Sequence, residues 1–251
     1  MTTTGPAAVE QAAVAAQMAV ALSRLLRDGE TVFFGVASPL PMVAALLARR
    51  LHAPDLVILT IPGGVDPEPS ALPISTVDPR LLVGAPALIT LADVFDLAAR
   101  GRLDTAFLGG VQIDRRGRIN LSAIGDDPQR PTVRLPGGAG SAALMPTAGR
   151  TILWRTRHDT RTFVPELSFV TAAGNVDRVV TPLCVLRRTD GVLDVESVHP
   201  FSRPDAVRDA TGFPVTVGPQ TPVTPEPTEA ELAALREIDP AGVVASEFQG
   251  R

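Results

Sequence analysis

The stretch TVFFGVASPLPMVAALLARRLHAPDLVILT, residues 31–60, determines the class of fold. TVFF is a short apolar run, typical of a buried strand, and it ends at Gly35. Ser38 can cap a helix whose first turn accommodates Pro39 or Pro41, and the pattern MVAALLARRL continues that helix. DLVILT is the next strand. A strand, a helix and a strand in this order predict parallel strands in an open α/β sheet.

The rest of the chain continues to alternate between helical and strand-like patterns. Helical patterns are expected at about 8–28, in LADVFDLAAR before Gly101, in PDAVRDATG and in TEAELAALREI. Strand-like patterns are LDTAFL, INLSAIG, the start of TVRLPGG, TILWRT, ELSFVTA, RVVTPLCVLRR and VLDVESVHP. Thr228 and Glu231 occupy the two capping-box positions of the last helix. No shift in composition divides the chain, so we expect residues 1–251 to form a single domain, with a proline-rich arm and helix at about 218–240.

Composition favours a globular cytoplasmic protein. The 251 residues are 45% apolar, which suits one large α/β domain, and a net charge of −4 without a block of like charges is not typical of nucleic-acid binding. Because Glu10 and Gln17 interrupt the N-terminal apolar run, we expect neither a targeting segment nor a membrane span. Cys184 is the single cysteine, and its strand-like surroundings indicate an inert buried thiol.

Glycine-bearing turns follow four of the expected strands. They are GVAS at 35–38, the pair Gly63-Gly64, GGVQID at 109–114 and GGAG at 137–140. Each turn alone is explained by backbone geometry. Parallel strands end at the same edge of a sheet, so four such turns together predict a shared pocket for an anion or an acyl group. None of them matches a P-loop or a dinucleotide-binding motif.

Polar residues in these turns offer hydrogen bonds but no complete catalytic set. Gln112 and Asn120 could donate to a carbonyl group or to a developing oxyanion. Asn120 could equally satisfy the backbone groups of a hairpin. Asp114, in DRRGR, is more typical of a turn than of a catalytic acid.

The three histidines give no sign of a metal site or of a catalytic triad. His52, His158 and His199 lie far apart in the sequence and lack ligand spacing, and no G-x-S-x-G motif is present. His158 lies in the arginine-rich segment RTRHDTRTF, which could meet a phosphate but is more typical of a solvated face.

Several stretches, in order, resemble the beta subunit of class I coenzyme A transferases. They are VFFGVASP, GGVDP, FLGGVQIDRRGRIN, VRLPGGAGSA, SFVT, SVHP, TGFPV and TEAELAALREIDP. GGVQIDxxGxxN followed by LPGGAG is the most specific part of a similarity that extends from about residue 26 to residue 243. The resemblance implies the coenzyme A transferase (NagB/RpiA-like) fold, an open, mostly parallel sheet flanked by helices. It also implies an alpha subunit of the same family as partner, in an α2β2 heterotetramer with the site between subunits.

The resemblance also implies roles for individual residues. In the family, a glutamate in the loop after the second strand attacks the acyl-CoA thioester. The backbone N–H groups of Val36 and Gly140 and the side chain of Asn120 match the family's oxyanion donors by position. The acyl-CoA substrate is expected against Gly35, Pro62, Gly63, Gly64, Gly109, Gly110, Gln112, Gly137 and Gly138. Coenzyme A is part of that substrate, and no separate cofactor or metal is implied.

TIPGGVDPEP, residues 60–69, departs from the family pattern at the nucleophile. Where the family has Glu-Ser-Gly or Glu-Asn-Gly, this chain has Pro62–Gly64, and its acids Asp66 and Glu68 lie further along. In lacking this glutamate, the chain resembles the cholesterol ring-cleaving hydrolase branch of the family. That branch implies carbon–carbon bond hydrolysis in the last steroid ring of an acyl-CoA, by a retro-Claisen step. The catalytic carboxylate then belongs to the alpha subunit, and the two glycines are interpreted as making room for a ring.

Two other functions stay open. The chain could be the beta subunit of an acyl-CoA:carboxylate CoA-transferase if Asp66 or Glu68 reaches the nucleophile position. It could also be a non-catalytic subunit that binds acyl-CoA.

Overall fold

The computed structural model describes residues 6–248, with side chains from residue 10 onward. Its internal contacts divide the chain into two compact units, residues 1–94 with 226–251, and residues 95–225. The single domain expected of residues 1–251 stays a prediction.

The first unit contains the strand–helix–strand arrangement predicted from residues 31–60. β1 (Thr31–Phe34) pairs in parallel with β2 (Val57–Leu59), and α2 (Pro39–Leu51) connects them. The chain then turns back, so β3 (Gly64–Val65) is antiparallel to β2, and β4 (Ala87–Leu88) is antiparallel to β3. The predicted parallel pair is confirmed, and it is extended by two short antiparallel strands that the sequence did not suggest.

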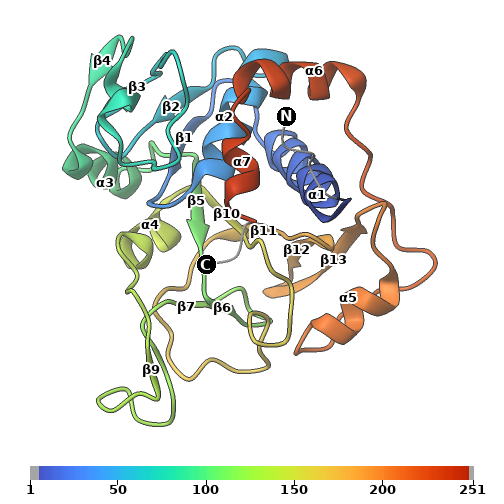
Figure 1. The fold of residues 1–251 in the computed structure, drawn as a ribbon. Coiled ribbons are helices and arrows are strands. Elements are labelled where there is room, and N and C mark those ends of the chain that lie inside the picture. Colours follow the sequence, from blue (N-terminus) through green and yellow to red (C-terminus); the bar gives the residue numbers. More distant parts are fainter. Residues whose placement is uncertain (1–5, 249–251) are drawn as a thin grey trace. The chain divides into compact units, whose positions relative to one another are not determined.

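Four helices pack together in the first unit, as Figure 1 shows. They are α1 (Pro6–Ser23), α2, α6 (Glu229–Ile238) and α7 (Val243–Ser246). Buried Val20, Leu47 and Ala234 form a small core where α1, α2 and α6 meet. α1 ends at Ser23, before the expected Asp28, because the next residues form tighter turns.

The second unit contains a mixed sheet in the order β13-β12-β11-β10-β5. β5 (Thr105–Gly109), β10 (Arg150–Trp154) and β11 (Val176–Val180) are parallel. β12 (Cys184–Thr189) and β13 (Val192–Val198) extend this sheet as an antiparallel hairpin. The sheets are thus mixed, with mostly parallel central strands, and helices flank them, as the sequence predicted.

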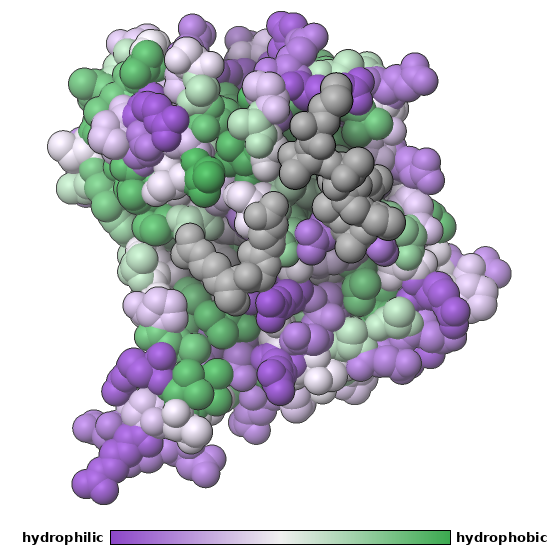
Figure 2. All heavy atoms as spheres, in the orientation of Figure 1, coloured by the Kyte–Doolittle hydropathy of each residue, from purple (hydrophilic) through white to green (hydrophobic). Residues whose placement is uncertain are grey.

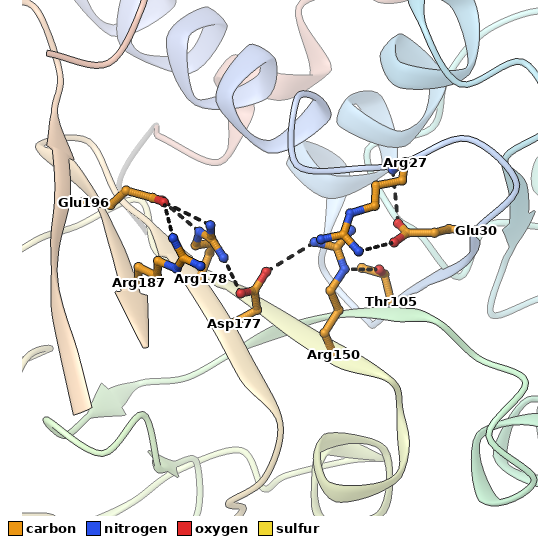
Figure 3. Close-up of polar contacts among 8 residues, drawn as sticks. All are labelled: Arg27, Glu30, Thr105, Arg150, Asp177, Arg178, Arg187 and Glu196. Atoms are coloured by element: carbon orange, nitrogen blue, oxygen red, sulfur yellow. Dashed lines mark hydrogen bonds and ion pairs between the residues drawn. The ribbon is translucent and has the colours of Figure 1, made fainter. Parts of the chain in front are cut away.

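Charged side chains connect the strands of the second unit across one face of its sheet (Figure 3). Arg150 on β10 lies 3.2 Å from Asp177 on β11, and Arg150 also donates to Thr105 on β5. Arg178, next to Asp177 and paired with it, forms a bidentate ion pair with Glu196 on β13 at 2.7 and 2.9 Å. Cross-strand pairs of opposite charge stabilise the register of a sheet.

Two small hairpins and three helices complete the second unit. β6 (Gln112–Ile113) pairs with β7 (Ile119–Asn120), and β8 (Ala123–Ile124) pairs with β9 (Val133–Arg134). Hydrophilic side chains gather at the tip of the β8–β9 hairpin, at the lower left of Figure 2. The helices are α4 (Ser141–Thr147), α5 (Pro204–Ala210) and α3 (Leu91–Ala99), whose first turn belongs to the first unit.

Three strand predictions in the second unit were wrong. INLSAIG, residues 119–125, forms two short strands, β7 and β8, which pair with different partners. ELSFVTA, residues 166–172, is irregular, with a single bridge between Ala172 and Ile119. The Thr171 N–H donates to the Ile119 carbonyl at 2.9 Å, and the Thr171 hydroxyl oxygen accepts from the Leu121 N–H at 2.8 Å, so the end of this segment is attached to β7 without forming a strand. RVVTPLCVLRR is two strands, because the chain turns at residues 181–183 between β11 and β12. Among residues 6–248, no helix has the length and apolar character needed to cross a bilayer.

Candidate functional site

The loop that follows β2 is packed tightly by its own chain. Gly63 has a φ of 106°, and a Cβ built on it would lie 2.2 Å from the Ile89 carbonyl oxygen. A Cβ on Gly64 would lie 2.0 Å from the Leu81 carbonyl oxygen. Both glycines are buried, whereas Pro62 before them is half-buried. Main-chain atoms of this chain fill the space that a Cβ would take at both positions, so packing accounts for the two glycines. The interpretation that they make room for a ring stays a prediction. Their predicted contact with substrate stays a prediction.

Asp66 has a structural role. Its Oδ1 accepts from the Ile58 N–H at 2.8 Å and from Arg49 at 3.0 Å, and its own N–H donates to the Ile58 carbonyl. Asp66 also has a left-handed φ of 50°. Because β3 is antiparallel to β2, residues after Val65 run back toward the amino end of β2. The chain thus carries Asp66 away from the strand end where the glycine turn lies.

Glu68 lies in a pocket of about 420 Å³ in the first unit. α2 contributes Arg49 and Arg50 to this pocket, and the end of α6 contributes Glu237. Arg50 pairs with Glu237 at 3.4 Å, so the charges of the lining partly offset one another. Apart from Glu68, the lining includes none of the residues that the sequence predicted for the site. α2 reaches the pocket with its last turn, near the amino edge of the parallel strands, opposite the edge of the glycine turns.

The turn after β1 lies at the same edge as the turn after β2, because the two strands are parallel neighbours. Val36 is 58% exposed, and among the described residues its N–H has no acceptor. The Thr76 hydroxyl donates to the Gly35 carbonyl at 2.9 Å. Thr76 is fully buried, and no sequence pattern indicated it because it lies in an irregular segment. Ser38 stands at the N-cap of α2, yet its hydroxyl donates to the Val36 carbonyl instead of capping the helix.

In the second unit, Gln112 and Asn120 face each other across the β6–β7 hairpin. Asn120 is fully buried, and its Nδ2 donates to Gln112 Oε1 at 2.9 Å and to the Ala123 carbonyl at 2.7 Å. Its Oδ1 accepts from the N–H groups of Ser122 and Ala123 at 3.0 and 3.2 Å. A carboxamide has two N–H donors, so both donors of Asn120 are engaged. Asn120 thus satisfies hairpin groups here, and its role as an oxyanion donor stays a prediction.

The glycine-rich loop is attached to this hairpin. The Gly137 N–H donates to the Leu121 carbonyl at 2.7 Å, and Gly137 adopts a φ of 98°. A Cβ on Gly138 would lie 2.5 Å from the Thr171 methyl group, so the loop packs closely against Thr171. The structure therefore attaches the loop with Gly137 and Gly138 to the hairpin with Gln112 and Asn120, through Leu121 and Thr171, and the substrate contacts of these residues stay a prediction.

Gly140 is the N-cap of α4, and its N–H has no acceptor among the described residues. A Cβ on it would lie 2.7 Å from the Phe95 ring. Gly109 ends β5, opposite Trp154 of β10. A Cβ on Gly110 would lie 2.9 Å from the Ile119 side chain, so glycine there lets the hairpin pack against the end of β5.

Asp114 and Cys184 behave as the sequence predicted. The Asp114 carboxylate accepts from the N–H groups of Arg116 and Arg118 and pairs with the Arg118 side chain at 2.6 Å, so it organises the turn. Cys184 is fully buried, and burial raises the pKa of its thiol to about 12. A thiol with that pKa is inert at neutral pH.

The solvated face expected around His158 was wrong for the histidine itself. Its ring stacks on Phe163 with centroids 4.2 Å apart, and its two nitrogens contact the hydroxyls of Thr181 and Thr211 at 2.8 and 3.0 Å. Burial lowers the pKa of His158 to about 4. His199 is also buried and contacts the Thr181 carbonyl at 2.9 Å, and burial lowers its pKa to about 4. Thr181 in the β11–β12 turn contacts both rings, and Thr211 at the end of α5 contacts His158, so both histidines are interpreted as packing groups.

Comparisons with known proteins agree with this architecture. The family model described as "Coenzyme A transferase" matches residues 15–210. The beta subunit of the 3-oxoadipate CoA-transferase of Pseudomonas knackmussii is 33% identical, over 93% of this chain and 95% of that protein. The cholesterol ring-cleaving hydrolase IpdB subunit of Mycobacterium bovis is 32% identical, over 92% of this chain and 96% of that protein.

A solved structure is also similar to this chain. The crystal structure of the decarboxylase AibA/AibB matches with a TM-score of 0.88 and 34% identity, and covers 94% of this chain and 99% of that one. The names of these three matched proteins state three different activities. The chain belongs to the coenzyme A transferase family, as a beta subunit.

Proposed function

We propose that the chain is the beta subunit of a heteromeric hydrolase that opens the last ring of a steroid-derived acyl-CoA by cleaving a carbon–carbon bond. The M. bovis relative, named as a cholesterol ring-cleaving hydrolase subunit, supports this proposal. The decarboxylase AibA/AibB supports its chemical class, because decarboxylation also breaks a carbon–carbon bond. The partner is an alpha subunit of the same family, in an α2β2 assembly.

One observation carries the proposal: the turn after β2 offers no nucleophile. Pro62, Gly63 and Gly64 occupy the turn, and the nearest acid, Asp66, is held by Arg49 and the Ile58 N–H. Glu68 lies in a separate pocket at the other edge. Transfer of coenzyme A through an acyl-enzyme needs a carboxylate at the thioester carbon. Hydrolysis of a carbon–carbon bond does not need one from this chain.

The proposed reaction is a retro-Claisen cleavage. A base on the alpha subunit removes a proton from water, and the resulting hydroxide forms a bond to the ring ketone carbon. The bond from that carbon to its neighbour then breaks, and its electron pair remains on the neighbour as an enolate conjugated with the thioester. Protonation of that carbon and release of the new carboxylate complete the reaction. The beta subunit supplies hydrogen-bond donors, and the exposed Val36 N–H and the Gly140 N–H are free to serve as such donors.

A CoA-transferase is the second candidate, because the P. knackmussii relative is a 3-oxoadipate CoA-transferase subunit. This alternative requires Asp66 or Glu68 to reach the thioester. For Asp66 that means breaking the contacts with Arg49 and Ile58, which are 3.0 and 2.8 Å long.

Co-expression with a candidate alpha subunit tests the proposal. The assembled complex would be assayed with coenzyme A esters that carry a keto ring, in water enriched in oxygen-18. We expect a ring-opened acid with one labelled oxygen, without a requirement for an acceptor carboxylate. Turnover that depends on an added carboxylate, with coenzyme A appearing on it, would instead identify a transferase.

A further inference from the structure

The orientation of the Asn120 side chain follows from its backbone neighbours. Oxygen and nitrogen of a carboxamide are distinguished by their hydrogen-bond partners. One end of this carboxamide faces the N–H groups of Ser122 and Ala123, which can only donate, and that end must be the oxygen. The other end faces the Ala123 carbonyl, which can only accept, so that end must be the nitrogen. Three main-chain groups thus determine which way Asn120 points.

Gln112 is oriented in turn by Asn120. The atom of Asn120 that faces Gln112, at 2.9 Å, is a nitrogen, so Gln112 must present its oxygen there. Its Nε2 therefore points away from Asn120. No residue in the described part of the chain accepts a hydrogen bond from this Nε2. Gln112 is half-buried, so a partly enclosed side chain carries two N–H donors that the protein does not use.

The place of Gln112 in the fold points to a ligand. It follows Gly109 and Gly110 at the carboxyl end of β5, the edge of a parallel sheet where ligands bind. Asn120, directly opposite on β7, is fully buried and cannot move without breaking its contacts with the hairpin. Donors held in a fixed direction stabilise a developing negative charge without a cost of reorganisation.

We propose that the Gln112 carboxamide is the side-chain donor to the thioester carbonyl oxygen of the acyl-CoA, and that Asn120 is a positioning residue that acts through Gln112. This inference rests on the proposed function, in which negative charge develops on that oxygen as the enolate forms. It reverses the roles suggested by sequence position, where Asn120 was the donor. Nε2 has two N–H groups and no acceptor, so its ligand atom is an electron-rich oxygen.

A double-mutant cycle in the assembled complex tests the division of roles. Gln112→Ala removes the donor, and we expect a fall in kcat of about 100-fold with a smaller change in KM, as for the loss of one oxyanion donor. Gln112→Glu keeps an oxygen that accepts from Asn120 but has no N–H donor. We therefore expect its kcat to fall as far as that of Gln112→Ala. Asn120→Asp turns a donor into an acceptor, so Gln112 rotates to donate to it and its Nε2 no longer faces the ligand.

Non-additivity is the decisive result. In the Asn120→Asp variant, Gln112→Ala should lower kcat by less than about 3-fold, because the effects of substitutions at coupled residues are not additive. A cost of about 100-fold in both backgrounds would show independent action and overturn the inference. The matched control is Gln129→Ala at the exposed tip of the β8–β9 hairpin, which should leave kcat unchanged. Thermal unfolding of each variant shows whether the hairpin is intact.

A binding measurement separates this inference from the proposed function. Calorimetry would compare an acyl-CoA thioester with its thioether analogue, which lacks the carbonyl oxygen. We expect the unsubstituted complex to prefer the thioester about 10-fold and Gln112→Ala to lose this preference. Equal affinities in the unsubstituted complex, or an unchanged preference in Gln112→Ala, would overturn the role of Gln112. A preference that depends on Gln112 without ring opening would refute the proposed reaction and leave the role of Gln112 standing.

Discussion

At Gly64 the main chain leaves no space for a methyl group, because the Leu81 carbonyl oxygen would lie 2.0 Å from the new carbon. We therefore expect Gly64→Ala to lower the free energy of unfolding by about 3 kcal/mol, since a rigid backbone group must move. Urea denaturation of the purified chain measures this. The loss should appear without any ligand, because it arises from packing within the chain.

Gly218→Ala is the matched control for this substitution. A Cβ added at Gly218 would have no atom within 4 Å, so we expect a change within about 0.5 kcal/mol. Equal stability of Gly64→Ala and the unsubstituted chain would contradict the packing explanation. That result would favour the interpretation that the glycine pair makes space for a ligand.

Half-buried His158 and buried His199 predict a loss of stability in mild acid. Burial lowers the pKa of His158 from 6.5 to about 4, so the unfolded chain takes up a proton in this range while the folded chain does not. Stability therefore falls as the pH drops from about 6.5 to 4. Between pH 7 and pH 5 we expect each such histidine to contribute a loss of about 2 kcal/mol.

Urea denaturation of His158→Gln at the two pH values tests this contribution. The variant should lose about 2 kcal/mol less between pH 7 and pH 5 than the unsubstituted chain, because glutamine does not titrate there. Identical losses of stability in the two proteins would show that protonation of His158 does not contribute to the acid sensitivity.

At the scale of the elements, α6 depends on its first turn. The Thr228 hydroxyl accepts from the Glu231 N–H at 3.2 Å, and the Glu231 carboxylate accepts from the Thr228 N–H at 2.7 Å and from Arg24 of the turn after α1. Hydrogen bonding to Arg24 lowers the pKa of Glu231 to about 2, so its carboxylate is charged at neutral pH.

We expect Thr228→Ala to lower the free energy of unfolding by about 1 kcal/mol, because one N-terminal N–H loses its acceptor. Chemical denaturation measures the change, with Thr160→Ala at an exposed position as the control. If both variants were equally stable, the capping box would contribute nothing to the stability of the fold.

Elements with a strong local signal were predictable from the sequence. The strand β1, the helix α2 and the capping box of α6 follow from apolar runs, helical spacing and cap residues, and all three are confirmed. The two-residue strands β3 and β4 were not predictable, because packing of Gly63 and Gly64 against distant carbonyl groups forms them. ELSFVTA had a strand-like composition, but its main chain meets β7 in a single bridge between Ala172 and Ile119, which is too short for a strand.

The candidate site was predictable in its residue types and less so in their roles. Glycine spacing identified the turns, and GGVQIDxxGxxN identified Gln112 and Asn120. Which of the two amides has free N–H groups depends on the Ser122 and Ala123 main chain, and no sequence pattern encodes that. The solvated face predicted for His158 was wrong because two of its partners, Thr181 and Thr211, lie far along the sequence, and because the local segment gave no sign that its ring stacks on Phe163.

For the whole molecule, we expect the isolated chain to be inactive. The proposed base belongs to the alpha subunit, and the described donors of this chain are hydrogen-bonding groups and not bases. Titrating the alpha subunit into a fixed amount of this chain should raise turnover until the two are equimolar. Full turnover by this chain without a partner would refute the shared site.

The central claim is that this chain breaks no thioester through a covalent intermediate of its own. Borohydride added during turnover of the assembled complex reduces any acyl-enzyme thioester to an alcohol, which peptide mass spectrometry detects. We predict that peptides covering residues 55–72 stay unmodified, with Asp66 and Glu68 intact, while ring-opened product accumulates. An alcohol in place of either carboxyl group would contradict the claim and identify a transferase.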